Sequence, residues 1–161
     1  MLTIAELKNI LPQEGILDHI VIRPEKRGEV ISVDQVAVDT QDGLEGDHYG
    51  KSGGKRMISL IQKEHLDMIA KWFNLEDIEH LTRRNLVISD INLLSLVDRE
   101  ILIGEDVILK ITGHCHPCSR METNLGPGGY NAMRGHGGLT ARVIRGGKIR
   151  IGDIVKTLIG V

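Results

Sequence analysis

The segment EILIGEDVILKIT, residues 100–112, places two apolar runs on either side of a Gly-Glu-Asp tripeptide at 104–106. Isoleucine, leucine and valine at this density favour extended backbone, and a glycine-containing break between two such runs is typical of a tight turn. The segment therefore predicts a β-hairpin. A second segment, ARVIRGGKIRIGD at 141–153, has the same pattern with its turn at 146–147, where positive φ costs glycine little.

Short segments rich in valine and isoleucine recur along the chain, separated by glycine, aspartate and asparagine. Such spacing is typical of many short antiparallel strands. We therefore expect a mainly β (α+β) fold, a barrel-like antiparallel β domain with a few short helices, and a length of 161 residues favours a single domain over 1–161. The candidate strands are residues 16–22, 29–38, 57–61, 86–88, 100–103, 107–112, 140–145 and 148–158.

Two segments have helical periodicity. TIAELKNIL, residues 3–11, begins with Thr3 and Glu6 at the spacing of a capping box. QKEHLDMIAKWF, residues 62–73, has an apolar stripe that should cover an open end or edge of the sheet. The apolar residues of the first helix are Ile4, Leu7 and Leu11, and those of the second are Leu66, Ile69, Ala70 and Phe73.

Charge and composition exclude several classes of function. The 20 lysines and arginines are matched by 22 acids, and a net charge of -2 argues against a general nucleic-acid binder. One tryptophan, two tyrosines and one phenylalanine are too few for a base-stacking platform.

No apolar run approaches the length of a membrane helix, and no secretion signal is seen. Two cysteines make no disulfide framework, so we expect a cytoplasmic protein.

The segment TGHCHPCSR, residues 112–120, contains both cysteines and allows three interpretations. A structural zinc site needs a second pair of ligands, which His48 or His136 would have to supply in space. A thioredoxin-like dithiol needs a helix N-terminus, but the sequence after Cys118 allows one helical turn at most. The third interpretation is burial as small hydrophobic side chains, which we favour for Cys115.

Cys118 differs from Cys115 because it follows Pro117, which ends the preceding strand and should place the thiol at a sheet end. Arg120 lies two residues away, and the segment 134–150 is basic. Neighbouring cations favour thiolate over thiol. The sequence therefore makes Cys118 a candidate nucleophile or metal ligand, with a structural role as the alternative.

Further candidate residues lie in glycine-rich loops. The segment GDHYGKSGGKR, residues 46–56, offers the backbone amides of Gly50, Gly53 and Gly54 as an anion nest beside Lys55 and Arg56, or else a loop with solvated charges. His48 is either a site residue or a turn residue. For His136 we favour a role in the site, because a polar ring among glycines has little core to pack against. Asp47 is expected to hold a turn.

Five blocks of sequence, in this order, resemble the MOSC domain, a family named for the C-terminal domain of molybdenum cofactor sulfurase. The resemblance covers roughly residues 16–158. The blocks are GLEGDHYG (43–50), RRNLVI (83–88), ILIGEDVILKITG (101–113), HPC (116–118) and RGHGGLTARVIRGGKIRIGD (134–153).

The resemblance implies a β-rich barrel associated with the molybdenum cofactor or with sulfur carried as a persulfide. In the family the cysteine of the Pro-Cys pair is the reactive residue, which here is Cys118 as catalytic group and metal ligand. The implied roles are sulfur carrier or transferase, or cofactor-binding protein. The alternatives are a molybdenum-dependent reductase of N-hydroxylated compounds, or a non-catalytic adaptor. The expected partners are the cofactor and a sulfur donor protein such as a cysteine desulfurase.

The phosphate of such a cofactor suits guanidinium groups, which pair with phosphate oxygens in a bidentate manner. Strand alternation predicts that only one of Arg83 and Arg84 faces the site. The residues expected to bind the cofactor are Arg56, Arg83, Arg84, Asn85, His48, His136 and Arg134.

Overall fold

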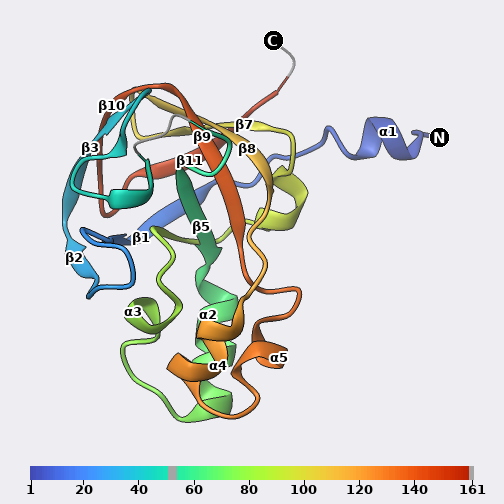
Figure 1. Ribbon diagram of the computed structural model, residues 1–161. Coiled ribbons are helices and arrows are strands. Elements are labelled where there is room, and N and C mark those ends of the chain that lie inside the picture. The colour runs from blue at the N-terminus through green and yellow to red at the C-terminus, as the bar shows by residue number, and fades with distance from the viewer. Residues whose placement is uncertain (51–53, 160–161) are drawn as a thin grey trace.

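A computed structural model describes residues 1–50 and 54–159, and in these residues seven strands close into a barrel. The order around the barrel is β11-β7-β8-β9-β5-β6-β1, and β1 closes the ring by pairing with β11 at Gly15↔Val155 and Ile16↔Ile154. The strands are β1 Gly15–Ile22, β5 Ile58–Gln62, β6 Leu86–Ser89, β7 Glu100–Ile103, β8 Val107–His114, β9 Leu139–Arg145 and β11 Ile154–Leu158 (Figure 1). The mainly β, barrel-like fold expected from the sequence is confirmed.

The pair β5–β6 is parallel, whereas the other neighbours around the barrel are antiparallel. Both strands are buried on two faces. Leu60 and Leu86 point into the barrel core, while Ile61 and Val87 belong to a second apolar cluster outside it. This accounts for the continuous apolar run of β5, because a strand covered on both faces does not alternate apolar and polar residues.

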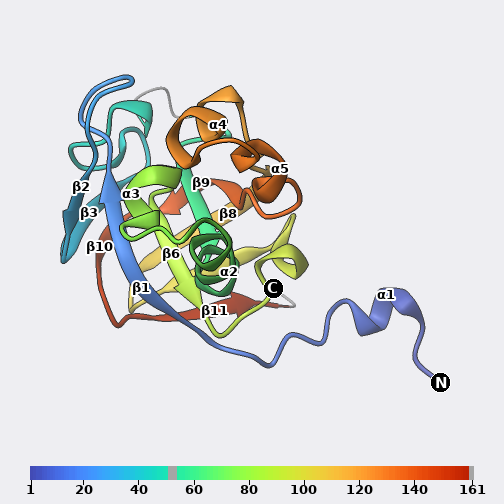
Figure 2. The same cartoon turned by 90° about the horizontal axis from the view of Figure 1, so that it is seen from below.

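A layer of helices supplies the second cluster (Figure 2). The helices are α2 Lys63–Phe73, α3 Ile78–Thr82, α4 Ser119–Leu125 and α5 Gly129–Met133. Leu66 and Ile69 of α2 are completely buried against this layer, so the predicted stripe does cover the sheet. None of the helices in the described residues has the length and apolar character needed to cross a membrane.

The expected hairpin at 141–153 is wrong. β9 pairs with β8 and β5, whereas β10, Gly147–Arg150, pairs with β3, Gln35–Asp39. β8 pairs with β9 along its length, whereas β5 pairs with it only at 139–141. The chain bends at 146–147 into a second sheet of order β10-β3-β4, in which β4 is Gly43–Leu44. Ile149 and Val38 of this sheet pack into the barrel core.

Two predicted strands are divided. The segment 29–38 forms β2, Ile31–Val33, and β3, and the segment 148–158 forms β10 and β11 with a turn at Gly152, where φ is +96°. The remaining elements are two short 3₁₀ helices, η1 His48–Gly50 and η2 Leu93–Leu96. The expected hairpin at 100–112 is confirmed, since β7 pairs with β8 up to Ile103↔Val107.

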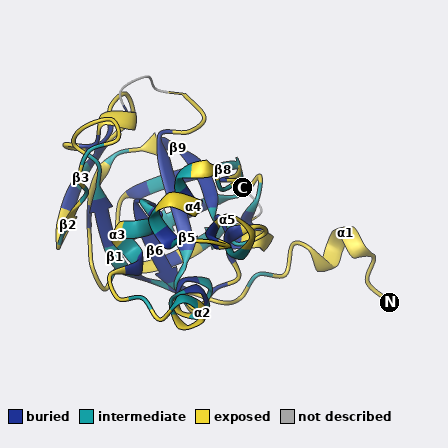
Figure 3. Cartoon of the chain, turned by 60° about the horizontal axis from the view of Figure 1, so that its bottom comes forward, coloured by how far each residue is buried: buried dark blue, intermediate teal, exposed yellow. Residues whose placement is uncertain are grey.

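The N-terminal helix α1, Ile4–Leu7, has the predicted capping box at Thr3 and Glu6 but extends away from the barrel (Figures 2 and 3). Ile4 and Leu7 are 69% and 47% exposed, so the expected apolar face contacts no core. Leu11 is the first residue of the arm that packs against the barrel.

The backbone at 137–138 packs very closely against two strands. A Cβ atom on Gly137 would lie 2.1 Å from the carbonyl oxygen of Cys115, and one on Gly138, where φ is +93°, would lie 1.9 Å from that of Leu60. Real Cβ atoms do not approach oxygen so closely, so both positions require glycine. This contact brings the start of β9 beside the Cys115 segment.

We predict that Gly138→Ala lowers the free energy of unfolding by about 3 kcal/mol or more, because backbone strain adds to the clash with Leu60. Gly135→Ala is the matched control, since Gly135 also has positive φ, +79°, but nothing lies within 4 Å of its added Cβ. It should cost only the strain, about 1–2 kcal/mol. Urea unfolding measures both. Equal losses would contradict the close packing.

Candidate functional site

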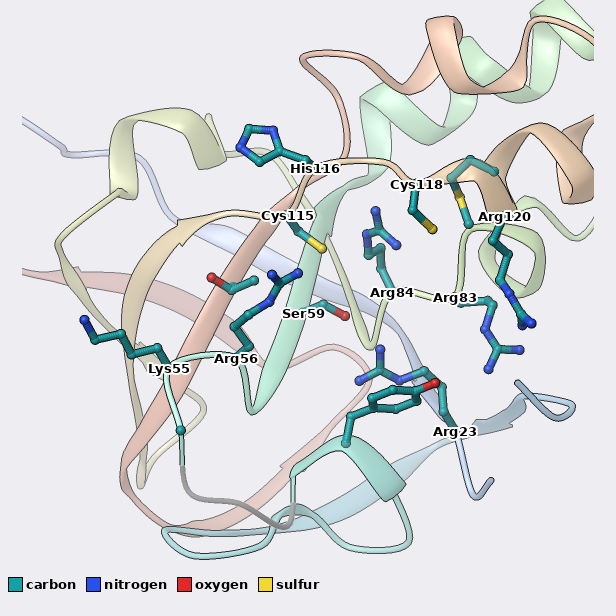
Figure 4. A pocket seen from close by; sticks show the side chains of 14 residues that line it. Arg23, Lys55, Arg56, Ser59, Arg83, Arg84, Cys115, His116, Cys118 and Arg120 are labelled. Carbon is teal, nitrogen blue, oxygen red and sulfur yellow. The ribbon is translucent and has the colours of Figure 1, made fainter. Parts of the chain in front are cut away.

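A cavity of about 820 Å³ opens where the end of β1, the α3–β6 connection and the β8–α4 segment meet (Figure 4). We call it the cationic cavity, because six of its lining residues are lysine or arginine and none is acidic among the described residues. Its cations are Arg23, Lys55, Arg56, Arg83, Arg84 and Arg120, and its other lining residues are Tyr49, Gly54, Ser59, Cys115, His116, Cys118, Met121 and Thr140.

Arg84 is the most deeply buried of these cations, at 8% exposed. Its Nε donates to the carbonyl oxygen of Gly137 at 2.7 Å, and its Nη1 donates to that of Thr82 at 3.0 Å. Within the described ranges no carboxylate forms an ion pair with it. Burial lowers the pKa of Arg84, and the nearby Cys115 thiol opposes this shift. A buried guanidinium with only carbonyl partners favours an anion close by.

Arg83 and Arg84 both line the cavity, which corrects the expectation that strand alternation admits only one of them. Alternation does not apply, because Arg83 caps α3 with φ of +60° and the strand begins only at Leu86. Nη1 of Arg83 donates to the carbonyl oxygen of Gly28, whereas its buried Nη2 has no hydrogen-bond partner. Burial lowers the pKa of Arg83, and the charge of Arg120 lowers it further.

Arg23, by contrast, has both an anionic and a neutral polar partner. Its Nε and Nη2 donate to the two carboxylate oxygens of Asp47, each at 3.1 Å, and Nη2 also donates to Oδ1 of Asn85 at 2.8 Å. The guanidinium lies 4.3 Å from the centre of the Tyr49 ring. The bidentate contact holds the guanidinium plane in one orientation at the cavity wall.

Asn85 is fully buried and joins this network to the barrel. Its Oδ1 accepts from the backbone N–H of Ser59 at 3.0 Å, and its Nδ2 donates to the carbonyl oxygen of Val21 at 2.9 Å and to Asp47 at 3.1 Å. Asn85 therefore positions Arg23 and Asp47 rather than lining the cavity. Asp47 also accepts from the backbone N–H of Tyr49, in keeping with the turn role expected for it.

The two cysteines are free, and both line the cavity from different depths. Cys118 is exposed, and Figure 4 shows its sulfur directed into the space beside Arg84. Cys115 is 8% exposed, in agreement with the predicted burial, yet it also faces Arg84. The arrangement places one accessible thiol and one buried thiol around the same uncompensated cation.

The helix after Cys118 is longer than predicted. Cys118 is the N-cap residue of α4, which continues for seven residues instead of one turn and ends at Gly126. No side-chain capping bond occupies the thiol. In the described residues no group of three or more His, Cys, Asp or Glu side chains is arranged to hold a metal ion, so the zinc interpretation finds no further ligands there.

Besides Asn85, three predicted cofactor-binding residues do not line the cavity. His48 lies behind Tyr49, with ring centres 5.3 Å apart, and Arg134 is exposed with Nη1 3.4 Å from Oδ1 of Asn131. His136 packs against His65 of α2, with ring centres 4.6 Å apart. Arg56 does line the cavity, but Gly53 of the predicted nest lies outside the described residues.

Sequence reasoning did not select Arg23, Ser59 or Tyr49. Arg23 directly follows the last residue of β1, and Ser59 lies within the apolar β5, where its hydroxyl accepts from the backbone N–H of Asn85. A polar residue inside an apolar strand was the one available signal, because a buried hydroxyl needs a partner. Arg23 had no local signal, since its partner Asp47 lies 24 residues further along the chain, in the loop after β4.

We predict that Asn85→Ala lowers the free energy of unfolding by about 3 kcal/mol, because backbone groups of Ser59 and Val21 and the guanidinium of Arg23 lose buried partners. The control is Asn131→Ala at an exposed position, which should change it by less than about 0.5 kcal/mol. Urea unfolding provides both values. A loss below about 1 kcal/mol for Asn85→Ala would show that the network is not needed for folding.

The histidine pair predicts a pH dependence of stability. Burial lowers the pKa of His65, and His136 lowers it further. The folded protein therefore binds a proton at His65 less readily than the unfolded chain does. The contribution of His65 to the free energy of unfolding is fully present at pH values well above the usual pKa of 6.5, and it decreases as the pH falls below that value. His65→Gln should flatten the thermal unfolding midpoint between about pH 5 and 7. Parallel profiles for the two proteins would contradict this origin.

A family model for the MOSC domain matches residues 45–156. The crystal structure of YuaD from Bacillus subtilis matches with a TM-score of 0.76 at 16% identity, covering 94% of this chain and 100% of that one. YiiM from Escherichia coli matches with a TM-score of 0.67 at 18% identity, covering 91% and 71%. YiiM from Geobacillus stearothermophilus matches with a TM-score of 0.68 at 16% identity, covering 89% and 75%.

No curated protein matches the sequence. The likeness to the three crystal structures concerns the fold alone. The family match spans more than half of the chain, from the loop before Asp47 to β11, and includes the Pro-Cys pair and both arginines of the α3–β6 connection. The chain therefore belongs to the MOSC domain family, which is associated with proteins of the molybdenum cofactor sulfurase type.

Proposed function

We propose that the chain is a molybdenum-cofactor-associated sulfur carrier, in which Cys118 carries a persulfide and the cationic cavity receives the phosphate-bearing cofactor. The observation that supports this most directly is the exposed thiol of Cys118 in a cavity with six cations and no acidic lining residue among those described. A cavity of this charge suits a ligand with more than one negative charge.

The cationic cavity fits the anionic part of such a cofactor. Nη2 of Arg83 is buried without a partner, and Arg84 is buried without a carboxylate, so both have unused donors for phosphate oxygens. Arg56 and Lys55 are exposed at the opposite rim, and exposed cations attract an anion before it docks. When bound, the cofactor supplies a metal centre that accepts sulfur as a ligand.

In this proposal Cys118 acts as nucleophile and carrier. Its thiolate attacks the outer sulfur of a persulfide on a donor such as a cysteine desulfurase, a sulfur–sulfur bond forms to Cys118, and the donor cysteine leaves as a thiolate. The cations around it stabilise a negative charge on sulfur. An acceptor that supplies the electron pair of the new bond then takes the outer sulfur, and the pair of the broken sulfur–sulfur bond stays on Cys118 as thiolate. Arg84 stays in place throughout, because two main-chain carbonyls orient it.

A second candidate function uses the same thiolate as a direct ligand of molybdenum, as in a reductase. It is favoured by the position of Cys118 on the cavity wall, where the metal of a bound cofactor would meet it. Soft thiolate ligands suit metals of this kind. The two candidate functions differ in what Cys118 should hold. A sulfur carrier should hold a persulfide on Cys118, whereas a metal-binding protein should hold molybdenum that is lost in Cys118→Ala.

The proposal predicts two measurements on protein produced in a host that makes the cofactor. Incubation with a cysteine desulfurase and cysteine should add about 32 Da to Cys118, and this should be absent in Cys118→Ala. Protein as isolated should contain pterin, and Arg56→Gln should weaken cofactor binding about tenfold, because it removes one charge-assisted contact without breaking an internal one.

Arg142→Gln is the matched control, because Arg142 is exposed on β9 and does not line the cavity. It should bind cofactor as the unchanged protein does. Absence of both the persulfide and the pterin would refute the proposal. Pterin and molybdenum without a persulfide would favour the second candidate, and a Cys118→Ser protein that retains full pathway function would leave only an adaptor role.

A further inference from the structure

Cys118 borders a second hollow besides the cationic cavity. This outer groove has a volume of about 600 Å³ and is lined by Arg27, Cys118, Ser119, Arg120, Thr123 and Asn124. Cys118 and Arg120 line both hollows, whereas Arg27 lines only the groove and Arg84 only the cavity. In Figure 4 the side chain of Arg120 lies on the far side of Cys118 from Cys115. Two molecules can therefore approach Cys118 from different sides.

The lining of the outer groove is rich in hydrogen-bond donors and has no carboxylate among the described residues. Neither Arg27 nor Arg120 forms an ion pair within the described part of the chain. The hydroxyls of Ser119 and Thr123 are exposed, and the amide of Asn124 is held by the carbonyl oxygen of Leu81 at 2.8 Å. Two free guanidinium groups beside two hydroxyls suit a small oxyanion or carboxylate.

The charges around Cys118 also favour a second anion. The charge of Arg120 lowers the pKa of Arg83, so these guanidinium groups repel each other across the region between the two hollows. An anion in the groove reduces this repulsion from the Arg120 side, even when the cavity holds a ligand of its own. The groove thus provides a separate place for a reactant that delivers or removes a group at Cys118.

We propose that the outer groove binds small anionic donors of sulfane sulfur and presents them to Cys118, an inference that rests on the sulfur-carrier function proposed above. The donor occupies the groove and the acceptor occupies the cationic cavity. Each is held by its own cations, Arg27 for the donor and Arg84 for the acceptor, and Arg120 lies between them. The carrier would then accept sulfur directly from a small molecule, without a donor protein.

The transfer balances for thiosulfate, the simplest donor of this class. The Cys118 thiolate attacks the outer sulfur of thiosulfate, a sulfur–sulfur bond forms to Cys118, and the sulfur–sulfur bond within thiosulfate breaks. Sulfite leaves with the electron pair of the broken bond, so a thiolate and S₂O₃²⁻ give a persulfide anion and SO₃²⁻. Glutathione persulfide, which has carboxylates in place of the sulfonate, reacts likewise and releases the glutathione thiolate.

The test is the rate of persulfide formation on Cys118 with thiosulfate, and in a second series with glutathione persulfide, followed by mass spectrometry. Both cysteines lie in one tryptic peptide, residues 111–120, so fragment ions assign the added sulfur. Arg27→Gln should raise the KM for the anionic donor about fivefold, because one exposed charge contact is lost. Arg142→Gln, exposed and lining neither hollow, should leave the KM unchanged.

A second measurement is independent of sulfur transfer. Alkylation of Cys118 by iodoacetate, an anion, is compared with alkylation by neutral iodoacetamide. Arg27→Gln should lower the ratio of the two rates about threefold and leave the iodoacetamide rate unchanged, because only the anion gains from the groove cations. An equal ratio in the two proteins would overturn the proposal.

The outcomes separate this inference from the proposed function. Labelling of Cys118 by the desulfurase but by neither small donor would overturn the groove as a donor site and leave the carrier function standing. Labelling by thiosulfate with the same KM in Arg27→Gln would also overturn it. If no donor of any kind labels Cys118, the carrier function and the groove proposal both fail. Labelling by one small donor alone, with the expected effect of Arg27→Gln, identifies that donor as the substrate type.

Discussion

Arg84 carries a guanidinium charge into the wall of the barrel, where its hydrogen-bond partners among the described residues are two main-chain carbonyls. Transfer of a charge out of water costs free energy that neutral dipoles repay only in part. Two other features of the site are arranged around this uncompensated charge of Arg84. The glycines at 137–138 are needed so that a carbonyl can reach Nε, and two thiols face the same charge.

Arg23 and Arg84, which have more side-chain hydrogen bonds than the other described cations of the cavity, illustrate two different uses of a cation. Arg23 is neutralised by Asp47 and held by Asn85, so it shapes the wall and contributes little net charge. Arg84 is oriented equally well but remains uncompensated. Such a division is what a binding site requires, because rigid neutral partners keep the geometry constant while the unpaired charge provides the attraction for a ligand.

Cys118 lies where two hollows of different character meet. The cationic cavity includes the buried Arg84, whereas the outer groove has the exposed Arg27, the half-buried Arg120 and two exposed hydroxyls. A carrier must meet a donor and an acceptor, and a single pocket would force these to exchange places. Two openings on one thiol remove that requirement. Cys115, buried behind Arg84, adds polarizable sulfur to the inner wall without being accessible itself.

The sequence by itself determined the mainly β barrel, the hairpin at 100–112, helix α2 and the family, because each depends on local periodicity, turn chemistry or an ordered set of motifs. Only the tertiary structure decided that Arg83 and Arg84 share one cavity and that Arg23 joins them there. It also decided that the ring of His136 packs against His65 instead of lining the cavity. It also decided that β10 leaves β9 for β3. The physical reason is that contacts between residues far apart in the sequence, and the positive φ of Arg83, set these directions, and neither can be read from local sequence.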